Sequence, residues 1–129
     1  MKLHLDRAPG LFLVTAIRDA DAEAPAAVAI NGVEYGGALL VQTSEPPVAW
    51  SIASFATLIE ADFEPLLALQ PDVVLVGTGV RQRFAHPRLY AGLTAAQIGV
   101  DFMDTAAACR TYNILAGEQR RVVAALIIE

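Results

Sequence analysis

Two apolar runs near the C-terminus constrain the fold of this chain more than any other feature. Residues 73–76 and 122–128 are continuous stretches of aliphatic, mostly β-branched side chains. Such runs are typical of strands buried on both faces, because neither face keeps polar side chains for solvent. Between them lies a helical segment, 105–116, that carries several polar side chains. The order strand, helix, strand predicts an α/β fold for the C-terminal half.

The rest of the chain is predicted to be built from short elements. Residues 28–30 and 33–35 flank Asn31-Gly32, a strong hairpin signal, because both residues tolerate a positive φ. The other expected elements are strands at 11–17, 38–42, 48–52 and 100–103 and helical segments at 62–69 and 89–97. In the helical segments, Pro65 is tolerable only in a first turn and Thr94 is a candidate cap. No repeat or linker interrupts the sequence, so residues 1–129 are expected to form a single domain.

The main helix, 105–116, has recognisable ends and faces. Asp104 or Thr105 can accept hydrogen bonds from the first free backbone N–H groups, and Gly117 is well placed to end the helix. At 100° per residue an apolar side forms, and a polar side with Arg110 and Asn113 lies opposite, with Thr111 on a flank. The apolar side is made of Ala108, Tyr112 and Leu115, with Cys109 and Ala116 at its edge.

Composition excludes several classes of protein. The net charge of −5 and the single lysine, Lys2, argue against a nucleic-acid partner and against a polybasic membrane patch. No apolar run approaches the roughly 20 residues that cross a bilayer, so no membrane insertion is expected. The lone cysteine, Cys109, cannot form an intramolecular disulfide, which suits a reducing compartment. These features are compatible with the cytoplasmic location that we expect for this protein.

The tripeptide Gly77-Thr78-Gly79 is the first candidate site. It follows a buried strand, where open α/β sheets tend to place ligands. Its backbone N–H groups, with Arg81 and Arg83 nearby, are candidates for holding an anion. The loop lacks the third glycine of a dinucleotide fingerprint and the lysine of a phosphate loop. A tight structural turn is the alternative to anion binding.

The cluster Arg110-Thr111-Tyr112-Asn113 is the second candidate site. Arg110 and Asn113 can present a guanidinium and an amide to a carboxylate or to the backbone of a partner. The structural alternative lets Asn113 hold a neighbouring loop and pairs Arg110 with an acidic neighbour, namely Asp101, Asp104 or Glu118. Both alternatives stay open at the level of sequence. Tyr112 is expected to be a core ring with a bonded hydroxyl.

Catalytic and metal chemistry have little support in the sequence. Cys109 lies one turn into a helix, where the helix dipole lowers a thiol pKa, but it also borders the apolar side, so a packing role is preferred. His4, His86 and Cys109 do not have the spacing of metal ligands. No catalytic residue, metal or cofactor is predicted.

Nearly the whole chain resembles a known family, through the hairpin, the Gly36-Gly37 break and Trp50 in the N-terminal half and more specifically after Pro71. The matching residues are Pro71, the run 73–76, Gly77-Thr78-Gly79, Met103, Thr105, 108–113, Leu115, Glu118 and Arg120. Their order and spacing are similar to those of small α/β proteins that include a mitochondrial assembly factor for respiratory complex I and a protein associated with adipocyte differentiation. The resemblance implies a single three-layer α/β domain with a mixed central β-sheet, an N-terminal β-hairpin region and a C-terminal helix–strand unit. It implies no catalytic residues.

Two classes of function remain. The first is a non-catalytic protein-binding or assembly-type module, which would expose an apolar or aromatic patch to another protein. Candidates for that patch are Trp50, Phe55, Phe63 and Phe84. The second is a small-molecule or anion-binding enzyme that uses Gly77-Thr78-Gly79 with Arg110 and Asn113, and it requires these groups to line one cleft. An exposed edge beside Gly36-Gly37 is compatible with a homo-oligomer.

Overall fold

The last strand of the chain, β8 (Val122–Ile128), lies at the centre of a five-stranded mixed sheet. It pairs antiparallel with β4 (Gly37–Gln42) and parallel with β6 (Val73–Gly77). The outer strands are β5 (Val48–Ala49), next to β4, and β7 (Gly99–Met103), parallel to β6. Every residue of β8 and of β6 is buried, as the two apolar runs predicted. Burial on both faces requires that other elements cover the sheet from each side.

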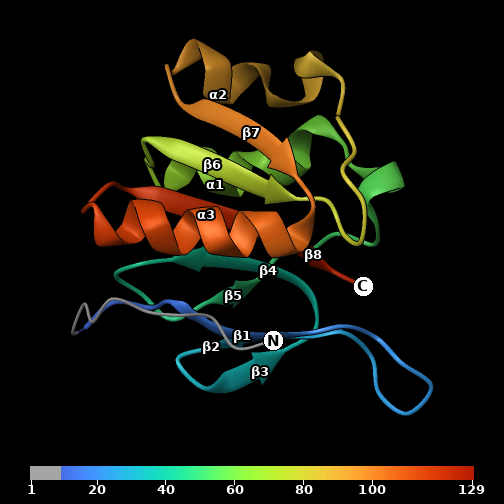
Figure 1. Ribbon diagram of the computed structural model, residues 1–129. Coiled ribbons are helices and arrows are strands. Elements are labelled where there is room, and N and C mark those ends of the chain that lie inside the picture. Colours follow the sequence, from blue (N-terminus) through green and yellow to red (C-terminus); the bar gives the residue numbers. More distant parts are fainter. Residues whose placement is uncertain (1–9) are drawn as a thin grey trace.

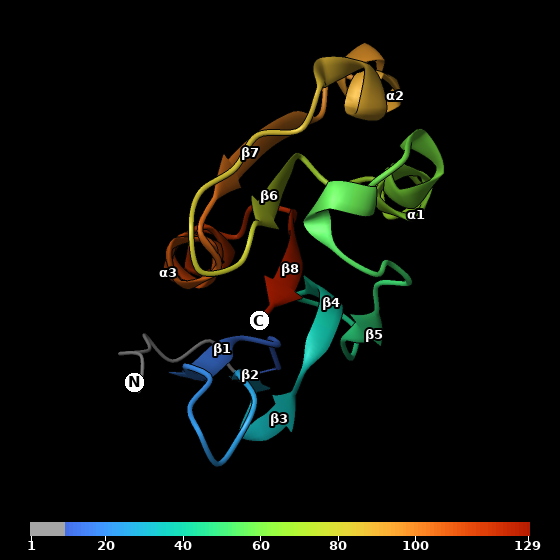
Figure 2. The same ribbon diagram turned by 90° about the vertical axis from the view of Figure 1, so that its right-hand side faces the viewer.

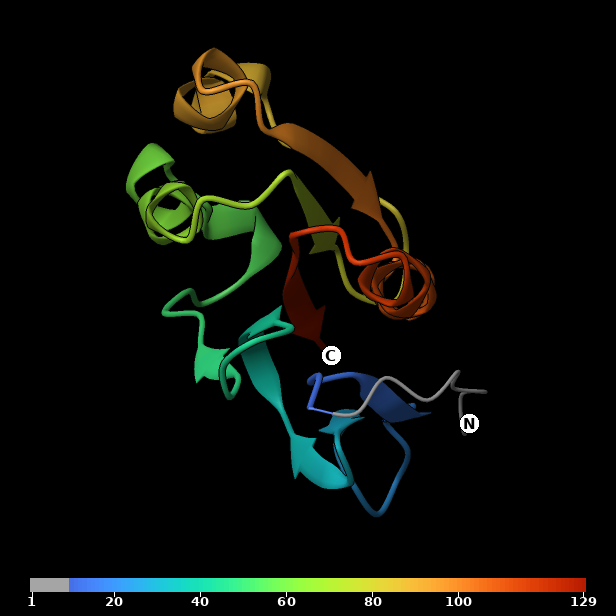
Figure 3. The same cartoon turned by 90° about the vertical axis from the view of Figure 1, so that its left-hand side faces the viewer.

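The computed structural model describes residues 10–129, and the predictions that involve Lys2 and His4 lie outside this range. Figures 1 and 3 show the central sheet as the middle of three layers. On one side lies α3 (Thr105–Gly117), and on the other lie the short helices α1 (Glu64–Ala68) and α2 (Ala91–Ala95). Two separate clusters of buried side chains fill the spaces on either side of the sheet. The predicted three-layer α/β architecture is confirmed.

A second, antiparallel sheet packs on the same side as α3. It contains β1 (Val14–Arg18), β2 (Ala27–Ile30) and β3 (Val33–Tyr35) in that order. The predicted hairpin between β2 and β3 is confirmed, and its turn places Asn31 at φ 47° and Gly32 at φ 85°. Figure 2 shows this sheet below the central one, with β4 leading from one to the other.

The first strand begins three residues later than the sequence predicted. The side chain of Asn31 bonds to the backbone just before β1: its Oδ1 accepts from the N–H of Leu13 (2.9 Å) and its Nδ2 donates to the carbonyl of Leu11 (3.1 Å). The side chain of Asn31 thus makes the hydrogen bonds at Leu11 and Leu13 that a neighbouring strand would otherwise make. The first strand is correspondingly short, from Val14 to Arg18.

Three other expected elements are shorter or tighter than predicted. The segment 62–69 forms the 3₁₀ turn η2 (Glu60–Phe63) and then α1, with Pro65 in the first turn as expected. The segment 89–97 forms η3 (Pro87–Tyr90) and α2, and Thr94 lies inside α2 rather than capping it. The strand expected at 48–52 shortens to β5.

The shortening of β5 follows from the position of the tryptophan ring. The backbone N–H of Trp50 still donates to the carbonyl of Ala38 (3.0 Å), next to the β4–β5 pairing. Its indole is buried and donates from Nε1 to the carbonyl of Asp62 (2.9 Å). The chain therefore leaves the sheet after Trp50 in order to run toward η1 (Phe55–Thr57).

Within residues 10–129, each of the three α-helices is followed by a glutamine in the left-handed conformation. Gln70, Gln97 and Gln119 have φ values of 52°, 62° and 63°, and each comes two residues after the last residue of its helix. Gly117, which was expected to end the main helix from outside, is instead its last residue. The left-handed position after a helix favours glycine, because any side chain there crowds the backbone. Each helix end therefore carries some strain.

Replacing one of these glutamines by glycine is expected to stabilise the fold. Gln119→Gly should raise the free energy of unfolding by about 0.5–1 kcal/mol, because glycine adopts the left-handed conformation without strain. The preceding residue, Glu118, has φ −89°, so Glu118→Gly should instead lower stability, through greater freedom of the unfolded chain. Urea unfolding of both variants checks the prediction, which fails if the two substitutions act in the same direction.

Candidate functional site

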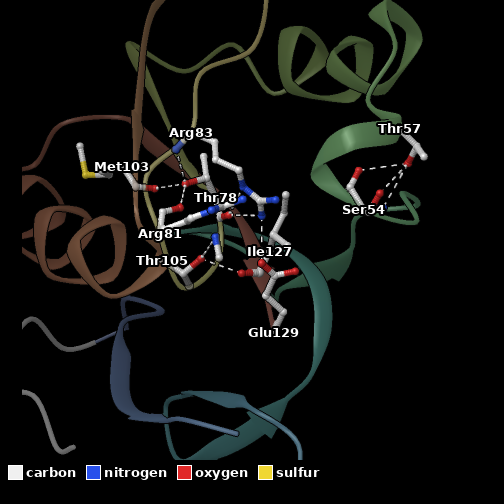
Figure 4. A network of polar contacts seen from close by, with 10 residues as sticks. Ser54, Thr57, Thr78, Arg81, Arg83, Met103, Thr105, Ile127 and Glu129 are labelled. Carbon is white, nitrogen blue, oxygen red and sulfur yellow. Dashed lines mark hydrogen bonds and ion pairs between the residues drawn. The ribbon is translucent and has the colours of Figure 1, made fainter.

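The loop after β6 is held by the side chain of Thr78. Thr78 is fully buried, and its backbone N–H donates to the carbonyl of Met103 (2.9 Å). Its hydroxyl donates to the carbonyl of Arg81 (2.7 Å) and accepts from the N–H of Arg83 (3.1 Å). Figure 4 shows the contacts of this hydroxyl with Arg81, Arg83 and Met103. Thr78 therefore closes a tight turn over residues 78–83.

Gly77 and Gly79 allow the loop to approach the start of α3. The N–H of Gly79 donates to Oγ1 of Thr105 (2.8 Å), whose hydroxyl donates in turn to the carbonyl of Ile127 in β8 (2.6 Å). Gly79 has φ 98°, and a Cβ there would collide with the carboxylate of Glu129. A Cβ on Gly77 would lie 3.0 Å from Oγ1 of Thr105. Both glycines are thus explained by close packing.

Arg83 also belongs to this hydrogen-bond network and links the loop to Glu129. Its guanidinium donates from Nε and Nη2 to the carbonyl of Thr78 and forms an ion pair with Glu129 (Nη2–Oε1, 2.9 Å). The same group lies 4.8 Å from the centre of the Phe55 ring, within the range of a cation–π interaction. The charge of Arg83 is therefore already balanced, and the N–H groups of Thr78 and Gly79 already have acceptors inside the protein.

Asn113 and Tyr112 fasten α3 to the small sheet. The side chain of Asn113 accepts from the N–H of Val14 (Oδ1, 2.9 Å) and donates to its carbonyl (Nδ2, 2.8 Å), as a neighbouring strand would. The hydroxyl of Tyr112 donates to the carbonyl of Phe12 (2.7 Å), and burial raises the pKa of this phenol. These bonds satisfy the free edge of β1, which would otherwise expose unpaired backbone groups.

Arg110 and Thr111 have a different environment from Asn113. Arg110 is exposed, and within residues 10–129 its side chain makes no hydrogen bond or ion pair. Its three expected acidic partners do not pair with it. Asp104 instead caps α3, accepting at Oδ1 from the N–H of Ala107 (2.9 Å). Thr111 is half-buried beside Arg110.

One depression of the described surface lies beside loop 77–79. Gly79, Asp104 and Thr105 border a depression of about 90 Å³ between α3 and the small sheet, and Arg110 is not part of its lining. Pockets for small ligands have volumes of roughly 300–1,000 Å³. The structure thus brings Gly77, Thr78 and Gly79 together with Thr105, but separates them from Arg110. In this depression, the loop residue Gly79 therefore lies with Asp104 and Thr105 and not with Arg110.

The aromatic candidates divide between core and surface. Trp50 and Phe63 are buried and stack edge to face with centroids 6.1 Å apart, so they belong to the core rather than to a binding patch. Phe55 is half-buried under Arg83. Phe84 is 72% exposed and is the one of these four candidates that is mostly exposed.

Cys109 is a packing residue of α3. Its side chain is fully buried, and burial raises the pKa of the thiol to about 12, which outweighs the opposing effect of Arg110. A thiol with this pKa is protonated at neutral pH and is a poor nucleophile. Among the described residues, no group of three or more His, Cys, Asp or Glu side chains could hold a metal ion.

Thr105 and Glu129 are the important residues that the sequence did not single out as a site. From the sequence, Thr105 is a candidate helix cap and a residue of the family resemblance, whereas in the structure its hydroxyl links the loop, α3 and β8. The signal available was its place, directly after a strand and at the start of a helix. Glu129 follows the last strand, and no local pattern pairs it with Arg83, 46 residues earlier.

The protein is therefore a small three-layer α/β protein. The polar cluster around loop 77–79 and the start of α3 holds elements of this fold together. The chain belongs to the family described as protein of unknown function, DUF498/DUF598, which matches residues 21–127. This agrees with the family resemblance found in the sequence.

Related proteins share both the sequence and the fold. NADH dehydrogenase (ubiquinone) 1 alpha subcomplex assembly factor 3 of Bos taurus is 35% identical over 102 residues, which cover 76% of this chain and 54% of the relative. The chain thus spans about half the length of the curated relatives it matches most strongly. A crystal structure of a Bordetella parapertussis protein is 36% identical with a TM-score of 0.85, covering 95% of this chain and all of that chain.

A solution structure gives the same fold a name. The Bordetella pertussis protein, described as an Mth938-like domain, is 32% identical with a TM-score of 0.79 and covers 99% of this chain and 92% of that chain. Within residues 10–129, none of the helices has the length and apolar character needed to cross a membrane.

Removing the amide of Asn113 is expected to destabilise the fold. In Asn113→Ala the N–H and carbonyl of Val14, a fully buried residue, lose their partners. The free energy of unfolding should fall by about 2–3 kcal/mol, because unsatisfied buried polar groups are costly. The neighbouring Ile114 is 61% exposed, so Ile114→Ala should change stability by about 0.5 kcal/mol or less. Chemical denaturation of both variants measures the two changes in the free energy of unfolding. Equal stabilities would show that Asn113 is not structural.

The thiol of Cys109 is expected to resist alkylation in the folded protein. At pH 8, iodoacetamide should modify the native chain at least about 100-fold more slowly than the chain unfolded in guanidinium, because a pKa near 12 leaves little thiolate and burial blocks access. Mass spectrometry of timed samples measures both rates, with Cys109→Ala as the unlabelled control. Comparable rates would contradict the packing role.

Proposed function

We propose that this domain is a non-catalytic protein-binding module that acts in the assembly of a larger protein complex. One observation supports the proposal most: the polar groups of loop 77–79 and of α3, which the sequence marked as candidate sites, form hydrogen bonds within the protein. The hydroxyls of Thr78 and Thr105 and the guanidinium of Arg83 all have internal partners. The cattle relative is named as an assembly factor, which supports an assembly role here.

The six candidate binding residues have two roles in this proposal. Gly77, Thr78, Gly79 and Asn113 shape the scaffold through their close packing and internal hydrogen bonds. Arg110 and Thr111 are the residues proposed to touch a partner. Ile114, one turn after Arg110, adds an apolar side chain that is 61% exposed on α3. An arginine beside an exposed apolar side chain is a common composition of protein interfaces.

The location and the state of assembly are also proposals. A buried, unpaired cysteine is compatible with a reducing compartment, so we place the protein in the cytoplasm. The partner is another protein rather than a nucleic acid, as the acidic net charge favours. A homo-oligomer is compatible with the short outer strands β3 and β5, which each leave one backbone edge available.

Chemical cross-linking in the native cell tests the proposed function. The tagged chain should capture a specific protein, and that protein, purified separately, should re-form the complex with the purified chain. A panel of metabolites, tested by thermal shift, examines the alternative that the chain is a small-molecule enzyme. A small molecule that raises the melting temperature and is turned over by the purified chain would overturn the proposal, as would failure to reconstitute any captured complex.

Arg110→Ala should weaken the reconstituted complex without destabilising the fold. Loss of an interface arginine is expected to cost about 1–2 kcal/mol of binding free energy. The free energy of unfolding should change by about 0.5 kcal/mol or less, since Arg110 makes no bond within residues 10–129. Titration calorimetry and urea unfolding measure the two effects. The control is Arg120→Ala, another exposed arginine, which should leave binding unchanged. A large loss of stability would assign Arg110 to the scaffold.

A further inference from the structure

The segment 80–88, here called the strap, carries the two most exposed large apolar side chains among the described residues. Val80 is 81% exposed and Phe84 is 72% exposed. In Figures 1 and 2 the strap, drawn in yellow, runs from the end of β6 past β7 toward η3. Single exposed apolar residues are ordinary on protein surfaces, but two on one short segment mark a candidate interaction site.

Internal bonds hold the strap in one conformation. Thr78 and Arg83 close its first turn, as described above. In the middle, Nε2 of Gln82 donates to the carbonyl of Phe102 in β7 (2.9 Å). At the far end, Nδ1 of His86 accepts from the N–H of Arg88 (3.1 Å). A segment fixed in this way loses little conformational freedom on binding, which favours affinity.

Phe84 connects the strap to the core on one side while exposing most of its ring on the other. Its ring lies 6.2 Å from that of Phe102, which in turn lies 5.3 Å from Tyr90. The contact orients the exposed part of the ring. Aromatic side chains that are held by packing and still face solvent are frequent anchors in protein interfaces.

The charge of the strap is opposite to that of the rest of the chain. Residues 73–100 contain three arginines and no aspartate or glutamate, although the whole chain has 14 acidic residues and a net charge of −5. Arg83 is paired with Glu129, but among the described residues Arg81 and Arg88 form no ion pair. Their side chains are exposed on either side of Phe84. The strap is therefore a basic, partly apolar surface on an acidic protein.

We propose that the strap binds an acidic segment of a partner protein, with Arg81 and Arg88 holding carboxylates and with Val80 and Phe84 contacting apolar side chains between them. Guanidinium groups form charge-assisted hydrogen bonds with carboxylates, and exposed apolar rings are buried at the same time. The acidic remainder of the chain repels nucleic acids and anionic lipids, which favours a short peptide over either extended polyanion. This inference rests on the proposed protein-binding function and names the chemistry of the partner.

Selection from a displayed library of random 12-residue peptides tests the proposal on the full chain. Selected peptides should be enriched in Asp and Glu together with at least one aliphatic or aromatic residue. Their synthetic, fluorescently labelled forms should bind in an anisotropy titration, and affinity should fall as salt is raised. A selection that yields no binders, or binders without acidic enrichment, overturns the proposal.

Matched variants show whether binding occurs at the strap. The double variant R81E/R88E should weaken peptide binding at least tenfold, and Phe84→Ala should weaken it at least threefold. The control R120E/R121E makes the same change of charge at the other end of β6 and should bind within twofold of the unmodified chain. Melting temperatures show that each variant is folded. Equal losses in both double variants would mean non-specific attraction and would overturn the proposal.

Two other probes separate the proposed partner from other anionic surfaces. Vesicles of phosphatidylglycerol and phosphatidylcholine, and polyuridylate RNA, should not bind the chain at physiological salt. Binding to either that is lost in R81E/R88E would overturn the proposal in favour of that surface. If a reconstituted cellular complex is unaffected by R81E/R88E, the strap proposal fails while the protein-binding function stands. If no cellular complex forms but acidic peptides bind the strap, the assembly function fails and the strap chemistry stands.

Discussion

The hydroxyl of Thr105 is the contact on which the rest of this structure depends. It accepts from the N–H of Gly79 in the loop after β6 and donates to the carbonyl of Ile127 in β8, so one buried group links that loop and β8 to the start of α3. Buried polar groups are tolerated only when they are bonded, and here both capacities of the hydroxyl are used. The close approach of these three elements in turn requires glycine at positions 77 and 79. Close packing thus accounts for both glycines of this loop.

Helix α3 acts as a clamp between the two sheets. Its apolar side, with Ala108 and Cys109, packs into the buried cluster on one face of the central sheet. Tyr112 and Asn113 reach the backbone before and within β1. Only the remaining side, with Arg110 and Ile114, faces solvent. The hydrogen-bonding side chains on this helix thus have two roles: Tyr112 and Asn113 bond to the backbone of the small sheet and the segment before it, and Arg110 is exposed.

Exposed groups in this protein are therefore more informative about binding than buried polar ones. The polar cluster around Thr78 is saturated, whereas the strap it supports presents Arg81 and Phe84 outward. The cluster gives the strap its fixed shape, since the hydroxyl of Thr78 and the guanidinium of Arg83 both hold its first turn. A loop whose polar groups are bonded internally can thus contribute to recognition indirectly, by holding a neighbouring surface in a shape ready for binding.

The sequence by itself determined the α/β class, the hairpin at Asn31-Gly32, the buried strands β6 and β8 and the extent of α3, because these depend on local periodicity and turn chemistry. Only the tertiary structure decided that Asn113 binds β1, a partner 99 residues away in the chain, and that Glu129 pairs with Arg83. Such pairings depend on which surfaces the folded layers bring together, and no local pattern encodes them. The same reason explains why the sequence grouped Arg110 and Asn113 as one candidate site, although in the structure Arg110 is exposed and the half-buried Asn113 bonds to β1.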